Sequence, residues 1–195
     1  FLQSGTAKFS FVPYYNGDYR WADGRARPVN DMVTAYGSSE ASLIALYTNG
    51  VFEAQKTVTG AYNNGSQNFR IGTSGSSANG LVGKIYASRI YDHVLTAGEV
   101  LFNANIDRMR FQNADAAELT WPEGVTYEDG QFWAEVRVTF DASKGSLAVG
   151  DIALESGALT KVPLELGGVV TVTATPAEGY RLIGFTGDES AKVDF

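Results

Sequence analysis

Residues 83–111 constrain the fold most, because this stretch changes character halfway along. Its first half, GKIYASRIYD, is rich in β-branched and aromatic residues, which favour a strand. Thr96 and Glu99 then form a T-x-x-E capping box, in which each side chain accepts a hydrogen bond from the other residue's backbone N–H. Val100 and Ala104 follow at helical spacing. The pattern predicts a strand that runs into a short helix with Thr96 as its N-cap.

The remaining pattern up to residue 112 is that of strands separated by turns. ASLIALYTNGVFEAQKTV is the clearest hairpin, because two apolar runs flank Asn49-Gly50, the strongest short hairpin signal. NFRIG, at residues 68–72, is a further expected strand. The helix is expected to end in a polar segment at 107–110 and to plug the open end of a β-sandwich.

The composition shifts after Gln112, and a second β-rich region follows. VVTVTAT alternates strictly, which places Val170, Val172 and Ala174 on one face of a strand. Closely spaced strands and turns predict a smaller β-sandwich. We expect its core to include four large aromatic residues: Trp121, Trp133, Tyr180 and Phe185.

The residues of the first half resemble a known family. Its closing pattern runs G-x-I-Y, I-Y, L-T-x-x-E, N and D-x-x-R-F. The matching positions are Gly83, Ile85, Tyr86, Ile90, Tyr91, Leu95, Thr96, Glu99, Asn103, Asp107, Arg110 and Phe111. The chain is therefore similar to the laminin-G-like, concanavalin A-like jelly-roll domains of bacterial surface proteins. The resemblance implies an all-β fold, a jelly-roll β-sandwich with one short capping helix.

The second half resembles the internalin B-repeat and related Ig-like bacterial repeats. VVTVTATPAEGYRLIGFTGD carries the match, at Pro176, Gly179, Tyr180, Phe185, Gly187 and Asp188. The two resemblances divide the chain into a jelly roll at 1–112 and a small β-sandwich repeat at 113–195. We expect the jelly roll to lack its N-terminal strands and the repeat to be truncated at its C-terminus.

Composition and the family resemblances limit the classes of partner that the protein can bind and the compartments in which it can reside. The formal charge of -7, with 15 scattered basic residues, argues against nucleic acid, which needs clustered Lys and Arg. No apolar run approaches the roughly 20 residues of a transmembrane helix, and no signal peptide is present in this chain. The absence of cysteine excludes disulfides and thiolate chemistry. The family resemblances imply a secreted or cell-surface protein.

The sequence carries no visible catalytic pattern. Glucanases of jelly-roll fold place their acidic residues as E-x-D-x-x-E, and no E-x-D occurs here. His93, the single histidine, is expected at the surface, at the corner between strand and helix. Ser74, Ser76 and Ser77 lack the nucleophile-elbow pattern. We therefore expect a protein that is not an enzyme.

Aromatic and polar residues gather in YYNGDYRWADGRA. Exposed aromatic faces stack on sugar rings, while carboxylates and amides hydrogen-bond hydroxyl groups. The candidate ligand-binding residues are Tyr15, Asp18, Tyr19, Trp21 and Asp23. The alternative is that some of these rings fill core beneath the loop.

Calcium is the one cofactor that the sequence suggests. Many laminin-G-like domains hold calcium at the sandwich rim, and Asp18 and Asp23 supply hard oxygen ligands close together in sequence. No EF-hand spacing is present. Asp18 and Asp23 are therefore the candidate calcium ligands.

Three functions remain open from the sequence. The first is a non-catalytic recognition or adhesion module that binds a glycan or an extracellular protein through sandwich loops. The second is a pair of structural stalk domains that space or present another module. The third is a glycoside hydrolase with carboxylates on loops. Fold alone does not choose among them.

Overall fold

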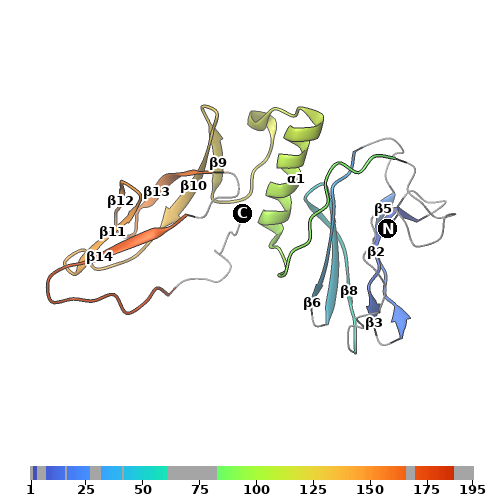
Figure 1. Cartoon of the computed structure of the whole chain (residues 1–195), viewed down its shortest axis with the longest axis horizontal. Coiled ribbons are helices and arrows are strands. Elements are labelled where there is room, and N and C mark those ends of the chain that lie inside the picture. Colours follow the sequence, from blue (N-terminus) through green and yellow to red (C-terminus); the bar gives the residue numbers. More distant parts are fainter. Residues whose placement is uncertain are drawn as a thin grey trace. The chain divides into compact units, whose positions relative to one another are not determined.

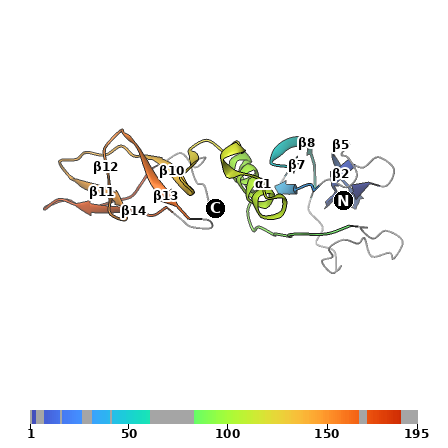
Figure 2. The same ribbon diagram turned by 90° about the horizontal axis from the view of Figure 1, so that it is seen from above.

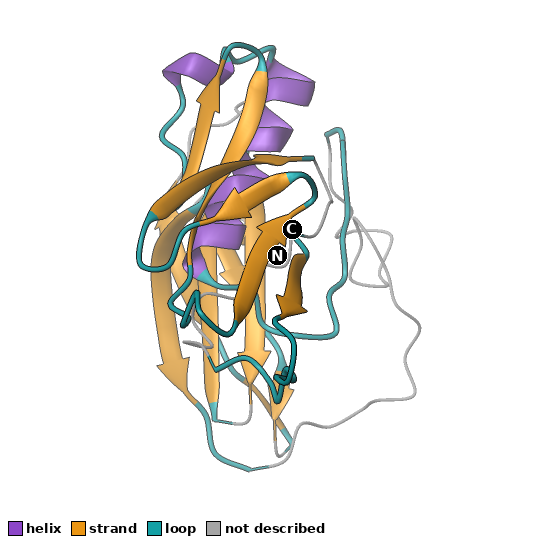
Figure 3. Cartoon of the chain, turned by 90° about the vertical axis from the view of Figure 1, so that its left-hand side faces the viewer, coloured by secondary structure: helices purple, strands orange, loops and turns teal. Residues whose placement is uncertain are grey.

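The structure is a computed structural model that describes residues 2–3, 8–15, 17–26, 32–40, 42–60, 83–165 and 170–186. The expected strand at 68–72 lies outside these residues. The chain forms two compact units, Phe1–Asn113 and Ala114–Phe195. In the described part, one α-helix accompanies several antiparallel sheets (Figure 3). The predicted all-β class, with a helix in the first unit, is confirmed.

The described residues of the first unit form two three-stranded antiparallel sheets, in the orders β1–β2–β5 and β6–β7–β8, and a two-stranded hairpin, β3–β4. The strands are β1 (Leu2–Gln3), β2 (Lys8–Phe11), β3 (Tyr14–Tyr15), β4 (Asp18–Tyr19), β5 (Ala22–Ala26), β6 (Ala35–Glu40), β7 (Leu43–Thr48) and β8 (Val51–Thr57). The helix α1 (Ala97–Gln112) closes the unit.

The predicted hairpin is present as β7 and β8. Thr48 pairs with Val51, so Asn49 and Gly50 are the two residues of the turn. Both have positive φ, 52° and 81°, as a type I′ turn requires. Asn tolerates this left-handed conformation and glycine adopts it without steric cost, which explains why this dipeptide makes the turn.

The two sheets pack face to face around an apolar core. Its buried residues are Ala22, Ile44, Leu46 and Val58, and Phe9 and Phe11 pack against them. Gly37 of β6 leaves room for the Phe11 ring, since a Cβ there would lie 2.2 Å from it. Figures 1 and 2 show the sheet β6–β7–β8 between α1 and the sheet that contains β2 and β5. The helix therefore covers a sheet face, whereas the sequence predicted a plug at the open end.

The start of α1 is as predicted. The backbone N–H of Glu99 donates to Thr96 Oγ1 (3.2 Å), and the backbone N–H of Thr96 donates to the Glu99 carboxylate (2.5 Å). The end of the helix differs from the prediction. Asp107, expected in a polar exit, is only 4% exposed, and the helix continues to Gln112 before Asn113 caps it with φ 53°. A charged partner explains the burial of Asp107.

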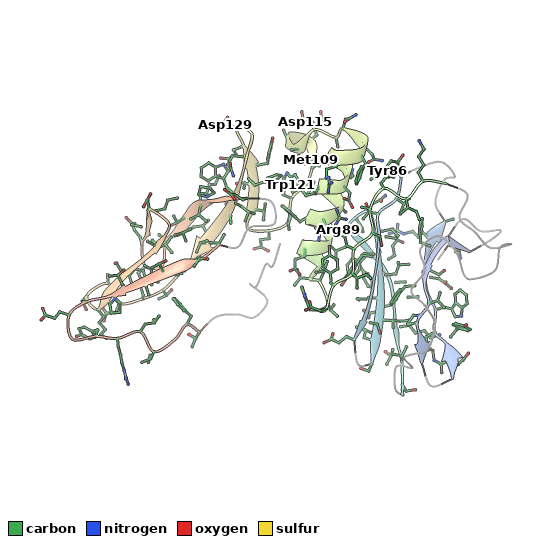
Figure 4. All side chains as sticks on the ribbon, viewed as in Figure 1. Tyr86, Arg89, Met109, Asp115, Trp121 and Asp129 are labelled. Carbon is green, nitrogen blue, oxygen red and sulfur yellow. The ribbon has the colours of Figure 1, made fainter. Side chains whose placement is uncertain are left out.

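That partner lies in residues 83–96, where the predicted strand is wrong. The segment has no regular secondary structure and no ladder partner among the described residues. Its side chains contact α1 instead (Figure 4). The Arg89 guanidinium donates to both oxygens of Asp107 (2.6 and 2.8 Å), and Tyr91 Oη accepts from the Asn103 amide (3.3 Å). Contacts with the helix thus take the place of the ladder that the β-branched residues suggested.

Where the structure describes the second unit, it has two three-stranded antiparallel sheets, in the orders β13–β10–β9 and β12–β11–β14. Its elements are the 3₁₀ helix η2 (Ala116–Glu118) and the strands β9 (Val125–Glu128), β10 (Gln131–Arg137), β11 (Gly145–Val149), β12 (Ile152–Leu154), β13 (Leu159–Leu164) and β14 (Val172–Pro176). The predicted smaller β domain is confirmed.

Both sheets contribute to the core of the second unit. Leu147 and Leu154 come from one sheet and Val162 from the other. Val170, Val172 and Ala174, predicted to share one face, all pack against this core as partly buried residues. The alternation of VVTVTAT therefore grouped them correctly, because side chains on a strand point to opposite faces in turn.

The aromatic residues expected in this core divide into two groups. Trp121 packs edge-to-face on Phe132 at 4.7 Å and donates from Nε1 to the Ala116 carbonyl. Tyr180 and Phe185 are instead 53% and 59% exposed, so the prediction is wrong for them. They follow β14 in a segment with no regular secondary structure, where no described strand covers them.

The turn after β10 is expected to stabilise the second unit to a degree that depends on pH. The backbone N–H and the hydroxyl of Ser143 both donate to Asp141 Oδ1, and Lys144 Nζ lies 3.0 Å from Oδ2. These donors favour the charged carboxylate and lower the pKa of Asp141 to about 2, from an ordinary value of 3.8. Because the folded pKa is depressed, this turn stabilises the unit above about pH 3.8, and the contribution disappears as pH falls towards about 2. Carboxylate NMR titration of the wild type should give that value, and Ser143→Ala should raise it. An unchanged pKa in the variant would contradict the assigned cause.

Candidate functional site

The candidate site begins at a hairpin that the sequence analysis treated as a loop. Tyr14 pairs with Tyr19 and Tyr15 with Asp18, and Gly17 lies in the turn between the two strands. Gly17 has φ 82°, the conformation that Asn-Gly turns use. In the sequence, Asn16-Gly17 is the same signal that identified the β7–β8 hairpin. The side chain of Tyr15, a predicted binding residue, lies outside the part of the chain that the structure describes.

Alternation continues from this hairpin into β5. Tyr19 is 60% exposed and Trp21 is 37% exposed, and Asp23 is exposed as well. The intervening residues Ala22 and Gly24 are buried. Since successive side chains of an extended chain point to opposite faces, the first three share the solvent side. Tyr19 and Trp21 therefore do not belong to the core beneath the loop.

The two predicted acidic residues have different partners. Asp18 Oδ2 accepts from Arg20 (2.5 Å), and its other oxygen accepts from the backbone N–H of Tyr19. Asp23 Oδ1 accepts from the hydroxyl of Ser10 (2.6 Å), the residue that pairs with it across β2 and β5. Asp18 is thus neutralised by a cation, while Asp23 keeps a carboxylate at the surface.

The suggested calcium site gains no support from the described side-chain contacts. No group of three or more His, Cys, Asp or Glu side chains is placed to hold a metal in the ranges that the structure describes. Both carboxylate oxygens of Asp18 already accept hydrogen bonds, one from Arg20 and one from the backbone of Tyr19. Calcium favours six to eight oxygen ligands. Calcium at Asp18 and Asp23 stays a prediction without support from these contacts.

The structure adds one group that the sequence analysis did not assign. Arg25 donates from Nε (3.0 Å) and from its backbone N–H (3.3 Å) to Oε2 of Glu53. The Glu53 side chain is 0% exposed, and its other oxygen accepts from the hydroxyl of Thr48 (2.6 Å). The Arg25 side chain is 75% exposed. Twenty-eight residues separate the two partners, so no local pattern could have revealed the pair.

The histidine lies at the surface, as predicted. His93 is exposed, and its Nδ1 lies 2.9 Å from Asp92 Oδ1. This contact lowers the pKa of the exposed Asp92 carboxyl. The loop serines Ser74, Ser76 and Ser77 lie outside the described residues. The Asp92–His93 contact is therefore a surface pair next to the start of α1.

Comparison with known families decides the classification of the first unit. A family model described as the concanavalin A-like lectin/glucanases superfamily matches residues 1–101, just over half of the 195-residue chain. The chain belongs to this superfamily. The match agrees with two antiparallel sheets packed face to face, and it makes the exposed stripe at Tyr19 and Trp21 a surface of a concanavalin A-like sandwich.

A second match covers the end of the chain. The divergent InlB B-repeat domain matches residues 152–194, within the second unit of this concanavalin A-like protein. No curated protein and no solved structure matches the chain. The two family matches together suggest a module of a bacterial surface protein. In the described residues, no helix is long and apolar enough to cross a membrane.

Proposed function

We propose that this protein is a non-catalytic recognition module of a secreted or surface-attached bacterial protein, and that it binds carbohydrate. The binding surface is the stripe formed by Tyr19, Trp21 and Asp23 on the solvent side of β4 and β5. The second unit serves as a spacer in the same surface protein.

One observation carries this proposal: the exposure of two consecutive outward-facing aromatic side chains, Tyr19 and Trp21. Aromatic rings at a surface supply flat apolar area that stacks on sugar rings. The Asp23 carboxylate next to them has no second hydrogen-bond partner for Oδ2 among the described residues, so this oxygen is available to a sugar hydroxyl. A superfamily that includes lectins makes a carbohydrate the ligand class to test first.

We propose a non-catalytic function because two acidic residues near the stripe are either paired or buried. Glycoside hydrolysis needs two carboxyl groups that flank the scissile bond. Near Tyr19 and Trp21, Asp18 is paired with Arg20, and the Glu53 side chain is fully buried. A protein–ligand function and a stalk function remain the alternatives that the experiment below distinguishes.

The proposal predicts that Trp21→Ala weakens glycan binding at least tenfold. A tryptophan at the centre of a binding site commonly contributes 2 kcal/mol or more, and about 1.4 kcal/mol corresponds to a tenfold change. A glycan array of the whole chain identifies the ligands, and titration calorimetry on the best one measures the loss.

Phe185→Ala is the matched control. Phe185 is another exposed aromatic residue, 59% accessible, but it lies in the second unit. It should leave the affinity unchanged. The proposal fails if the wild type binds no glycan on the array, and the site is wrong if both variants lose affinity equally. Absence of any ligand would favour the stalk function.

A further inference from the structure

Residues 84–92 have no role in the proposed function, and their surface is open. Their composition favours a strand, yet no ladder uses their backbone in the part of the chain that the structure describes. Arg89 and Tyr91 hold the segment on α1 (Figure 4). Ile90, between these two residues, is 73% exposed, as expected where neighbouring side chains of an extended chain point to opposite sides. The segment is therefore fixed by the helix on one side and open to solvent on another.

The open surface of this segment is apolar as well as unpaired. Ile85 and Tyr86 are 50% and 52% exposed, in addition to Ile90. A fixed, extended chain with apolar side chains and no ladder is a template on which a further strand can pair. Two strands alone are marginally stable in water, but strands that pack against a helix are supported. Since α1 supplies that support, the surface fits another extended chain.

The sequence of the segment indicates which chain fits. KIYASRIYD is nearly palindromic about Ser88, because apolar and charged residues recur at equal distances from this centre. Two copies can therefore pair as antiparallel strands about a two-fold axis at Ser88, and the axis repeats every contact. In this register the residues of one copy face the following residues of the second copy: Lys84 faces Asp92, Ile85 faces Tyr91, Tyr86 faces Ile90, and Ala87 faces Arg89.

These pairs are of the kinds that stabilise antiparallel strands. Opposite charges, and aromatic residues across from β-branched ones, are both favourable when they lie directly opposite each other. The charged partners are available, since Lys84 is exposed and the Asp92 side chain is 99% exposed. A shift of two residues would place Arg89 opposite its own copy, or Lys84 opposite Ile90. The complementary register is therefore well defined.

We propose that the protein forms a homodimer in which residues 84–92 of two copies pair as antiparallel strands, each supported by its own α1. This proposal does not depend on carbohydrate binding. The contact is small compared with the interfaces of permanent dimers, so a dissociation constant of about 1–100 µM is expected.

Sedimentation velocity of the whole chain tests the dimer directly. Between about 1 and 500 µM, the protein should change from monomer to dimer. Hydrogen exchange at both ends of this range locates the contact. Peptides from residues 83–96 should become more protected in the dimer, because their amides enter a ladder. Peptides from the second unit should exchange equally at both concentrations.

A charge cycle assigns the dimer to this register. Lys84→Asp and Asp92→Lys each turn two favourable pairs into two repulsive ones, and each should raise the dissociation constant about fivefold or more. The double variant exchanges the charges but keeps them complementary, so it should return to within about twofold of the wild type. Lys56→Asp is the matched control, because it makes the same change of charge at an exposed residue of β8.

An apolar pair of variants tests the centre of the ladder. Ile90→Ser removes two buried contacts per dimer and should raise the dissociation constant about tenfold, whereas Ile183→Ser should not change it. Ile183 is 90% exposed and lies in the second unit. Because both isoleucines are at the surface of the monomer, neither change should lower its melting temperature.

The outcomes decide the proposal. A monomer at every concentration overturns it. It is also overturned if Lys84→Asp and Lys56→Asp weaken the dimer equally, or if the double charge variant does not recover, because the copies then pair in another way. Weakening by each single change at Lys84 and Asp92, together with recovery in the double variant, supports the two-fold register about Ser88.

Discussion

Gly50→Ala is expected to destabilise the first unit by about 2–4 kcal/mol. Two independent effects add at this position. Gly50 has φ 81°, where a residue with a Cβ is strained by about 1–2 kcal/mol. A Cβ at Gly50 would also lie 2.8 Å from the Leu101 side chain and 2.9 Å from the Leu101 Cα. The backbone of a helix cannot yield easily, so overpacking adds about 1–3 kcal/mol, and the stiffer unfolded chain offsets a part of this sum.

Gly17→Ala is the matched control for this prediction. Gly17 lies in the turn between β3 and β4 with almost the same φ, 82°, but a Cβ there meets nothing within 4 Å. It should therefore cost only the conformational part, about 1 kcal/mol. The difference between the two variants measures the contact between the hairpin turn and α1.

The measurement is chemical denaturation of the whole chain, followed by hydrogen exchange of peptides from residues 42–60. Because the chain has two compact units, a single transition cannot be assumed, and the peptides report on the first unit directly. Equal losses for Gly50→Ala and Gly17→Ala would mean that the turn does not depend on the helix.

These two glycines also illustrate what the sequence predicts well. A two-residue turn and a capping box are decided by residues next to one another or three positions apart. Asn49-Gly50, Thr96 and Glu99 were accordingly placed correctly. Asn16-Gly17 carries the same local signal in the sequence, but the tyrosines around it suggested a loop with a ligand, whereas β3 and β4 form a hairpin.

The misplaced parts depend on partners that are distant in sequence. Asp107 was expected in solvent, because nothing near it in sequence shows that Arg89 reaches it. Glu53 lies in a strand whose alternation is interrupted by a bulge, and its partner Arg25 is 28 residues away. In the candidate site, composition pointed to Tyr19 and Trp21. Only the structure, in which exposed residues alternate with the buried Ala22 and Gly24, places the two rings outside the core.

The second large expected effect is a loss of stability when the contact between residues 83–91 and α1 is broken. Three contacts run along the helix in antiparallel order: the rings of Tyr86 and Phe111 at 5.3 Å, the ion pair of Arg89 with Asp107, and the hydrogen bond between Tyr91 and Asn103. The ion pair is the middle one. It replaces the β ladder that this segment lacks among the described residues, so its loss should detach the segment from the helix.

Removing Arg89 and removing Asp107 are expected to lower the stability of the first unit by different amounts. Arg89→Met leaves the Asp107 side chain, 6% exposed, as a buried charge without its cation, and should cost about 3–5 kcal/mol. Asp107→Leu leaves Arg89, which is already 32% exposed and can be rehydrated, so it should cost roughly half as much. The double variant Arg89→Met with Asp107→Leu should recover most of the loss, because a packed apolar pair of similar volume often replaces a buried ion pair without cost.

A double-mutant cycle by chemical denaturation, with exchange of peptides from residues 83–112 as the local probe, measures the coupling. Lys161→Met is the control, because its partner is Glu128 and both side chains are about half exposed, 42% and 54%. An exposed pair of this kind contributes about 0–1 kcal/mol. If Arg89→Met costs no more than Lys161→Met, the segment is held by the other two contacts, the rings of Tyr86 and Phe111 and the hydrogen bond between Tyr91 and Asn103. If it costs several times more while the double variant recovers, the buried ion pair is what fixes residues 83–91 against the helix.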